Sequence, residues 1–131
     1  MPEPIAAGAI VYAKDIARLA HFYAEVMALE IMHEAADHVV LESETLELVI
    51  VAIPEPTAAR IVISSPPARR EYTAFKLVFA VDSLVEARVV AAAAGGGVDA
   101  PGKEWDFQGA RVCDGFDPEG NVIQLREYAP D

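Results

Sequence analysis

The feature that most constrains this chain is an internal repeat. Residues 8–16 align without gaps with residues 76–84, and in each copy an apolar strand leads directly into the start of a helix. Three strand-like stretches follow each helix. Repetition of one supersecondary unit indicates two similar modules that pack together. We therefore expect one α+β domain over residues 1–131, with βαβββ modules at about 5–53 and 72–128 and a linker at about 54–71.

Module one has clear helix and strand signals. The apolar segment 5–13 predicts a buried strand. Asp15 is a good N-cap for the helix that follows. One stripe of that helix recurs at helical spacing and predicts its buried face; all its residues are apolar but the last: Ile16, Leu19, Tyr23, Val26, Met27 and Glu30. Further strands are expected at 30–34, 37–43 and 45–53.

The linker is interrupted by prolines. Pro54, Pro56, Pro66 and Pro67 exclude a central strand here, because proline cannot donate to the hydrogen-bond ladder. The short β-branched run 61–63 nevertheless predicts an edge strand inside the linker.

Module two repeats the pattern and has its own helix start, helix stop and turn signals. A strand is expected at 73–81, and Ser83 with Glu86 forms a capping-box sequence at the start of the next helix. The helix is expected to end near Ala94, because the glycines at 95–97 tolerate the left-handed conformation found after helix ends. Three strands should follow, at about 98–107, 109–116 and 121–128, with a turn at 117–121 before the last one.

Composition excludes several classes of function. The 131 residues carry a net charge of −11, which would repel a nucleic-acid backbone. No apolar run approaches the roughly 20 residues needed to cross a bilayer, and the N-terminus lacks the basic segment of a signal peptide. The single cysteine, Cys113, cannot form an intramolecular disulfide. We expect a cytoplasmic protein with no nucleic-acid and no membrane partner.

Three segments in this order resemble the vicinal-oxygen-chelate superfamily, which includes glyoxalases, bleomycin-resistance proteins and extradiol dioxygenases. They are the strand, Asp-Ile and Phe-Tyr-containing helix at 12–23, the strand and helix start at 76–84, and the Asp-Pro-Glu-Gly-Asn turn with its strand at 116–125. The resemblance implies a cupped mixed sheet with helices outside it. In metal-bearing relatives, four side chains in the cup hold a divalent ion that stabilises negative charge in the transition state.

The metal positions that the resemblance implies fall on Gly8, Glu47, Lys76 and Gln124. Glycine has no side chain, and a protonated lysine has no lone pair to offer. Two oxygen ligands remain, fewer than catalytic metal sites usually require. We therefore expect no metal cofactor. If Glu47 and Lys76 both face the cup, they can form an ion pair in place of the metal, with Gln124 completing the network.

Four other residues are candidate ligand contacts. Tyr12 shares the phase of Gly8 and could place its hydroxyl in the cup, and Arg111 could contact an anion. Trp105 and Phe107 could form an apolar wall at the mouth, although core or dimer packing explains them slightly better. Lys76 could likewise serve in a purely structural ion pair.

Three functions agree with these observations. The first is a metal-free protein of the bleomycin-resistance type that binds a small organic molecule in the cup, and we expect it to be a homodimer. The second is an enzyme of the same superfamily: a glyoxalase, lyase, dioxygenase, epimerase or thiol transferase, either metal-dependent or using Lys76 or Glu47 as acid or base. The third is a structural module whose cup is filled by bulky side chains, namely Ile10, Val49, Val51 and Val78.

Overall fold

The first module forms a four-stranded mixed sheet. In the computed structural model, which describes residues 4–130, the order of strands is β1-β4-β3-β2. Strand β1 runs parallel to β4, and the remaining pairs are antiparallel. The elements of this module are β1 (Gly8–Ala13), α1 (Ile16–Met27), β2 (Glu30–Glu34), β3 (His38–Glu42) and β4 (Glu47–Ala52).

The second module repeats this topology, which confirms the βαβββ repeat and the α+β class. Its strand order is β5-β9-β8-β6, with β5 parallel to β9, and β7 also pairs with β8. Strands β6 and β7 both pair with β8, so together they take the position that β2 holds beside β3 in the first module. The elements are β5 (Val78–Ala80), α2 (Leu84–Ala93), β6 (Gly97–Val98), β7 (Trp105–Phe107), β8 (Ala110–Phe116) and β9 (Val122–Tyr128).

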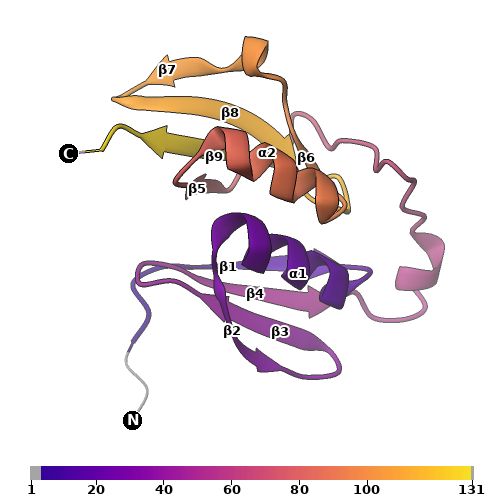
Figure 1. Cartoon of the computed structure of the whole chain (residues 1–131). Helices are drawn as coiled ribbons and strands as arrows, with labels where there is room; N and C mark the ends of the chain where they lie inside the picture. The colour runs from indigo at the N-terminus through magenta and orange to yellow at the C-terminus, as the bar shows by residue number, and fades with distance from the viewer. Residues whose placement is uncertain (1–3, 131) are drawn as a thin grey trace.

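The two helices lie between the two sheets (Figure 1). One face of each sheet packs against the helices, and the buried side chains of both modules form one continuous core. Phe22 and Tyr23 of α1 pack edge to face, with 5.3 Å between their ring centroids. The Tyr23 ring also lies against Phe79 of β5, with 5.7 Å between the ring centroids. Within one chain the sheet therefore does not run continuously through both modules, and the other face of each sheet is turned outward.

Both helices begin where the sequence predicts. The Asp15 side chain accepts a hydrogen bond from the Arg18 amide at 3.1 Å, and Ser83 accepts one from the Glu86 amide at 3.1 Å. Helix α2 is followed by Gly95 with φ of 93°, as expected of a helix stop. Neither helix, nor any other helix within residues 4–130, has the length and apolar character needed to cross a membrane.

The turn before β9 joins the two modules through buried carboxylates. Asp117, which is fully buried, accepts a hydrogen bond from the Tyr23 hydroxyl at 2.8 Å. Glu119 accepts from the backbone amides of Lys14 and Asp15, at 2.9 and 2.8 Å, just before α1. Burial raises the pKa of Asp117, although its hydrogen-bond donors, led by Asn121, oppose that shift. The turn is thus a structural contact between modules.

Three strand predictions were wrong in extent. Residues 61–63 form no strand and follow a short 3-10 turn, η1 (Ala58–Arg60), within the proline-rich linker. The strand expected at 73–81 is reduced to β5, and the one expected at 98–107 is divided by η2 (Pro101–Lys103). In η2 the proline supplies no amide hydrogen for a ladder, which explains the break between β6 and β7.

Candidate functional site

The outer face of the first sheet carries several residues that the sequence predicts to line a cup. Side chains alternate along β1 and β4, so Val11, Leu48 and Ile50 face the helices. The pairing of Gly8 with Glu47 then places both on the outer face, together with Ile10 and Tyr12. Ile10 is 63% exposed and Tyr12 62% exposed. Around Ile10 and Tyr12 this outer face is apolar and exposed.

A row of carboxylates crosses the same face. Glu30 of β2 pairs with Glu42 of β3, which pairs with Glu47 of β4. Like charges directly opposite each other on neighbouring strands repel and destabilise the sheet. Positive charge approaching this face would relieve that repulsion.

The outer face of the second sheet carries the cations. Lys76 lies just before β5, and its ammonium contacts Asp114 of β8 at 3.1 Å. Asp114 pairs with Gln124 of β9, whose side-chain oxygen accepts a hydrogen bond from the Arg126 guanidinium at 2.8 Å. Two polar contacts, Lys76 with Asp114 and Arg126 with Gln124, therefore lie on neighbouring strands of this face.

Aromatic rings border these polar contacts. The Arg126 guanidinium lies 5.0 Å from the centre of the Phe107 ring, within the range of a cation–π contact. Trp105 is opposite Val112 and Phe107 is opposite Ala110, so strand pairing puts both rings on this face. Trp105 is 36% exposed and Phe107 44% exposed. The structure thus gathers Lys76, Gln124, Trp105 and Phe107 on one surface.

The hypothesis of a Glu47–Lys76 ion pair is wrong for a single chain. Lys76 contacts Asp114 instead, and no ion pair in residues 4–130 joins it to Glu47. The physical reason is the arrangement of the modules. Glu47 and Lys76 lie on the outer faces of different sheets, with the helices between those sheets (Figure 1).

Arg111 lies apart from this group. On β8 its side chain points to the face opposite that of Val112 and Asp114. Its guanidinium contacts Glu104 at 3.1 Å and Asp106 at 3.2 Å. Glu104 also accepts a hydrogen bond from Arg88 of α2 at 2.7 Å. Arg111 therefore belongs to an ion-pair network on the helix side of the sheet.

Asp114 is the residue of the outer face that the sequence analysis overlooked. The sequence feature that could have identified it is that Asp114 is the one charged residue in the strand segment 112–116. Alternation along the strand puts its side chain on the same face as that of Val112. One of its oxygens contacts Lys76, and the other is buried without a hydrogen-bond partner. A buried unpaired carboxylate oxygen is unfavourable, so this position favours a further donor.

The side chains at the four positions implied for a metal do not fit a divalent ion. Gly8 offers no donor, and the ammonium of Lys76 is engaged with Asp114. In the part of the chain from residue 4 to residue 130, no group of three His, Cys, Asp or Glu side chains is placed to hold a metal. What the two outer faces offer is apolar surface with a few charged and amide groups.

The chain belongs to the Glyoxalase-like domain family, whose model matches residues 8–126. Its fold, with two βαβββ modules, is that of the glyoxalase/bleomycin-resistance/dioxygenase proteins, consistent with the vicinal-oxygen-chelate superfamily. No curated protein matches the sequence significantly.

Solved structures resemble the whole chain. A glyoxalase/bleomycin resistance protein/dioxygenase family enzyme from Burkholderia phytofirmans PsJN has a TM-score of 0.68 and 18% identity over 96% of this chain and 100% of that one. A genomically encoded fosfomycin resistance protein from Listeria monocytogenes has a TM-score of 0.63 and 14% identity, covering 100% and 95%. A bleomycin resistance determinant encoded on the transposon Tn5 has a TM-score of 0.59 and 19% identity, covering 94% and 97%. At these identities the likeness shows the fold.

Proposed function

We propose that the protein binds a small organic molecule, without a catalytic metal, in a cup formed between two copies of the chain. The outer face of module one in one copy covers the outer face of module two in the other. A two-fold symmetric dimer contains this arrangement twice. The observation that carries the proposal is that both outer faces are exposed and apolar, through Ile10 and Tyr12 on one and Trp105 and Phe107 on the other.

Charge complementarity supports this pairing of faces. The row of Glu30, Glu42 and Glu47 on module one would meet Lys76 and Arg126 on module two. Opposite potentials on two surfaces favour their association and set its orientation. In such a dimer Glu47 and Lys76 lie in the same cup although they belong to different chains.

The kind of occupant follows from the groups that line the cup. A concave apolar site with a few convergent polar groups is typical of binding sites for small organic molecules. Two of the similar structures carry names that refer to resistance to bleomycin and to fosfomycin. These two compounds are therefore reasonable first probes for this protein.

The test combines metal analysis with ligand titration. The protein, purified without a metal-affinity tag, is incubated with Mn, Fe, Co, Ni and Zn ions and desalted, and the bound metal per chain is measured. Calorimetric titrations with bleomycin and with fosfomycin follow, on the wild type and on Lys76→Met and Trp105→Ala. Val85→Ala, which changes an exposed residue of α2 away from both outer faces, is the matched control.

We expect less than stoichiometric metal and saturable binding of at least one probe, weakened about tenfold or more by Trp105→Ala and Lys76→Met. Val85→Ala should bind as the wild type does. Nearly one metal per chain, lost in Glu47→Ala, would contradict the metal-free site and favour a metal-dependent enzyme of the superfamily.

A further inference from the structure

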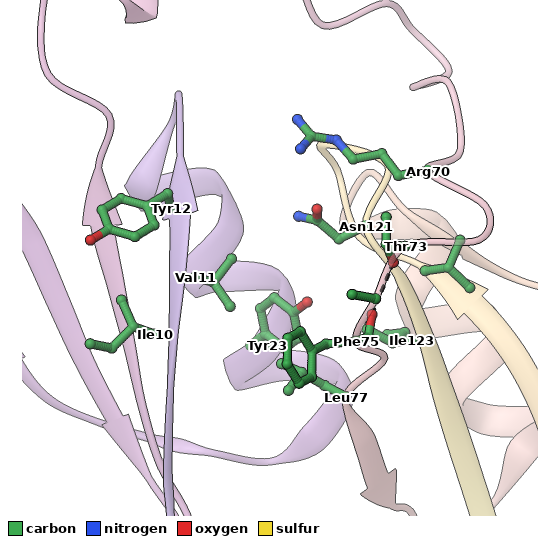
Figure 2. Close-up of a pocket in the computed structure, with 12 residues that line it drawn as sticks. Ile10, Val11, Tyr12, Tyr23, Arg70, Thr73, Phe75, Leu77, Asn121 and Ile123 are labelled. Atoms are coloured by element: carbon green, nitrogen blue, oxygen red, sulfur yellow. Dashed lines mark hydrogen bonds between the residues drawn. The ribbon is translucent and has the colours of Figure 1, made fainter.

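A second cavity lies inside a single chain, on the helix side of the sheets (Figure 2). It has a volume of about 350 Å³, within the range of sites that hold small molecules. Its walls come from β1, from the segment that leads into β5, and from the start of β9. Val11 points from β1 toward Tyr23 of α1, whereas Ile10 and Tyr12 point away to the outer face (Figure 2). Ile10 and Tyr12 also line the cavity, so it shares β1 with the proposed cup, with Val11 on the cavity side of the strand.

The cavity is electrostatically unlike the rest of the molecule. The sequence has 21 acidic and 10 basic residues, yet the residues lining the cavity include no carboxylate and a single charged side chain, Arg70. The neighbouring Arg69 is engaged by Asp99 and Glu71. No ion pair found within residues 4–130 involves Arg70. An accessible guanidinium beside an uncharged cavity favours an anion.

Arg70 is held beside the cavity by its backbone. Its amide donates to the Gly120 carbonyl at 2.7 Å, and it forms an isolated β-bridge with Asn121. The Arg70 and Asn121 side chains both line the cavity, at the end opposite Leu77 in the view of Figure 2. Asn121 donates one amide hydrogen to Asp117 at 2.8 Å, which fixes its orientation and leaves its other amide hydrogen for a ligand.

The nearest buried carboxylate does not compete for this site. Asp117 is not part of the cavity lining. Its oxygens accept hydrogen bonds from the Tyr23 hydroxyl, the Asn121 amide group and the backbone amides of Glu119 and Asn121. The Asp117 carboxylate is therefore occupied by these hydrogen bonds.

The rest of the lining is apolar and includes aromatic rings. Val11 and Leu77 contribute partly exposed aliphatic side chains, whereas Tyr23 and Ile123 also line the cavity but are buried. Phe75 lines the cavity and is 89% exposed. A flat apolar body in the cavity would remove part of the Phe75 ring from water, which is favourable at roughly 25 cal/mol per Å².

We propose that this cavity binds a small monocarboxylate with an aromatic body, its carboxylate on Arg70 and Asn121 and its ring among Val11, Leu77 and Phe75. Guanidinium groups bind carboxylates through two parallel hydrogen bonds, which gives both affinity and orientation. The ligand takes one face of β1 while the cup uses the opposite face of the same strand. Although Ile10 and Tyr12 belong to both linings, every residue that lines the cavity comes from one chain, so the site does not need a partner copy.

Phenylacetate is the probe that tests this site. Its binding is measured by calorimetry and by amide chemical shifts in NMR spectra, with phenylethylamine and phenylacetamide as the cationic and neutral analogues of similar shape. Two variants are matched: Arg70→Gln, and Arg60→Gln, which removes an exposed arginine of η1 outside the cavity. A third, Leu77→Trp, fills the cavity without removing the charge.

We expect phenylacetate to bind more tightly than either analogue and to shift the amide signals of Val11, Leu77 and Asn121. Arg70→Gln should weaken binding about tenfold or more, Leu77→Trp should also weaken it, and Arg60→Gln should leave it unchanged. The absence of binding, binding that Arg70→Gln does not change, or an equal loss in Arg60→Gln would each overturn the proposal. So would a loss in Lys76→Met alone, since that result places phenylacetate in the cup.

Discussion

Single carboxylates in this protein have distinct electrostatic roles, and Glu104 shows how one can be measured. It accepts hydrogen bonds from Arg88 of α2 and from Arg111 of β8, at 2.7 and 3.1 Å. The hydrogen bond from Arg88, helped by Arg111, lowers the pKa of Glu104 from its usual value despite desolvation. A carboxyl group whose pKa is lowered in the folded state stabilises the fold above its unfolded pKa. That contribution disappears as the pH falls through the folded pKa.

We predict that Glu104→Gln lowers the free energy of unfolding at pH 7 by roughly 1 kcal/mol, because neutral glutamine binds the two guanidinium groups less strongly. The difference from the wild type should shrink as the pH falls below the usual glutamate value of 4.5. Urea unfolding of both proteins over a series of pH values measures this difference in the free energy of unfolding. Glu44→Gln, at an exposed position in the turn between β3 and β4, is the control. A difference that does not change with pH would contradict the electrostatic explanation.

At the scale of single elements, the start of α1 depends on a residue far away in sequence. Local signals place the helix start, since Asp15 caps the Arg18 amide. The preceding amides of Lys14 and Asp15 donate to Glu119 in the turn of module two. Glu119 is only 5% exposed, so its loss leaves these donors without a partner in a poorly solvated place.

We predict that Glu119→Ala destabilises the protein by roughly 2 kcal/mol. Glu25→Ala, which removes an exposed carboxylate from α1 itself, should change stability by less than about 0.5 kcal/mol. Denaturant unfolding of both variants makes the comparison. Equal effects of the two substitutions would show that the contact between modules does not stabilise α1.

At the scale of the whole molecule, the exposed outer faces predict an assembly. Stable interfaces between proteins bury at least about 1,200 Å² in total, and the two outer faces offer apolar side chains for such a contact. Ile10 is exposed on the outer face of β1, beside the acidic row. A carboxylate placed there would add to the repulsion on this face and oppose association.

We predict that the wild type is a dimer and that Ile10→Glu shifts it to the monomer while circular dichroism shows the fold retained. Light scattering coupled to size-exclusion chromatography measures the mass of each form. Val85→Glu, which adds the same charge at an exposed position of α2, should remain dimeric. A wild type that is monomeric at about 100 μM would contradict the assembly that we propose.

The sequence alone was sufficient for the repeat, the starts of both helices, the end of α2 and the turn before β9. Each of these depends on residues within a few positions of one another, as with Asp15 and Arg18, Ser83 and Glu86, or the glycine after α2. It was also sufficient to place Glu47 and Gln124 on equivalent strands of the two modules, β4 and β9, because the repeat sets the order of the strands.

Only the tertiary structure decided which of these residues meet. Lys76 contacts Asp114 and not Glu47, because the helices of both modules share one core and the two outer faces are turned apart. The cavity beside Arg70 likewise requires β1, α1 and β9 to come together, although these elements are distant in sequence. Local signals depend on neighbouring residues and can be read in order along the chain. The orientation of one module relative to the other depends on how the helix-covered apolar faces of the two sheets pack together. That packing is a property of both modules and cannot be found in either one alone.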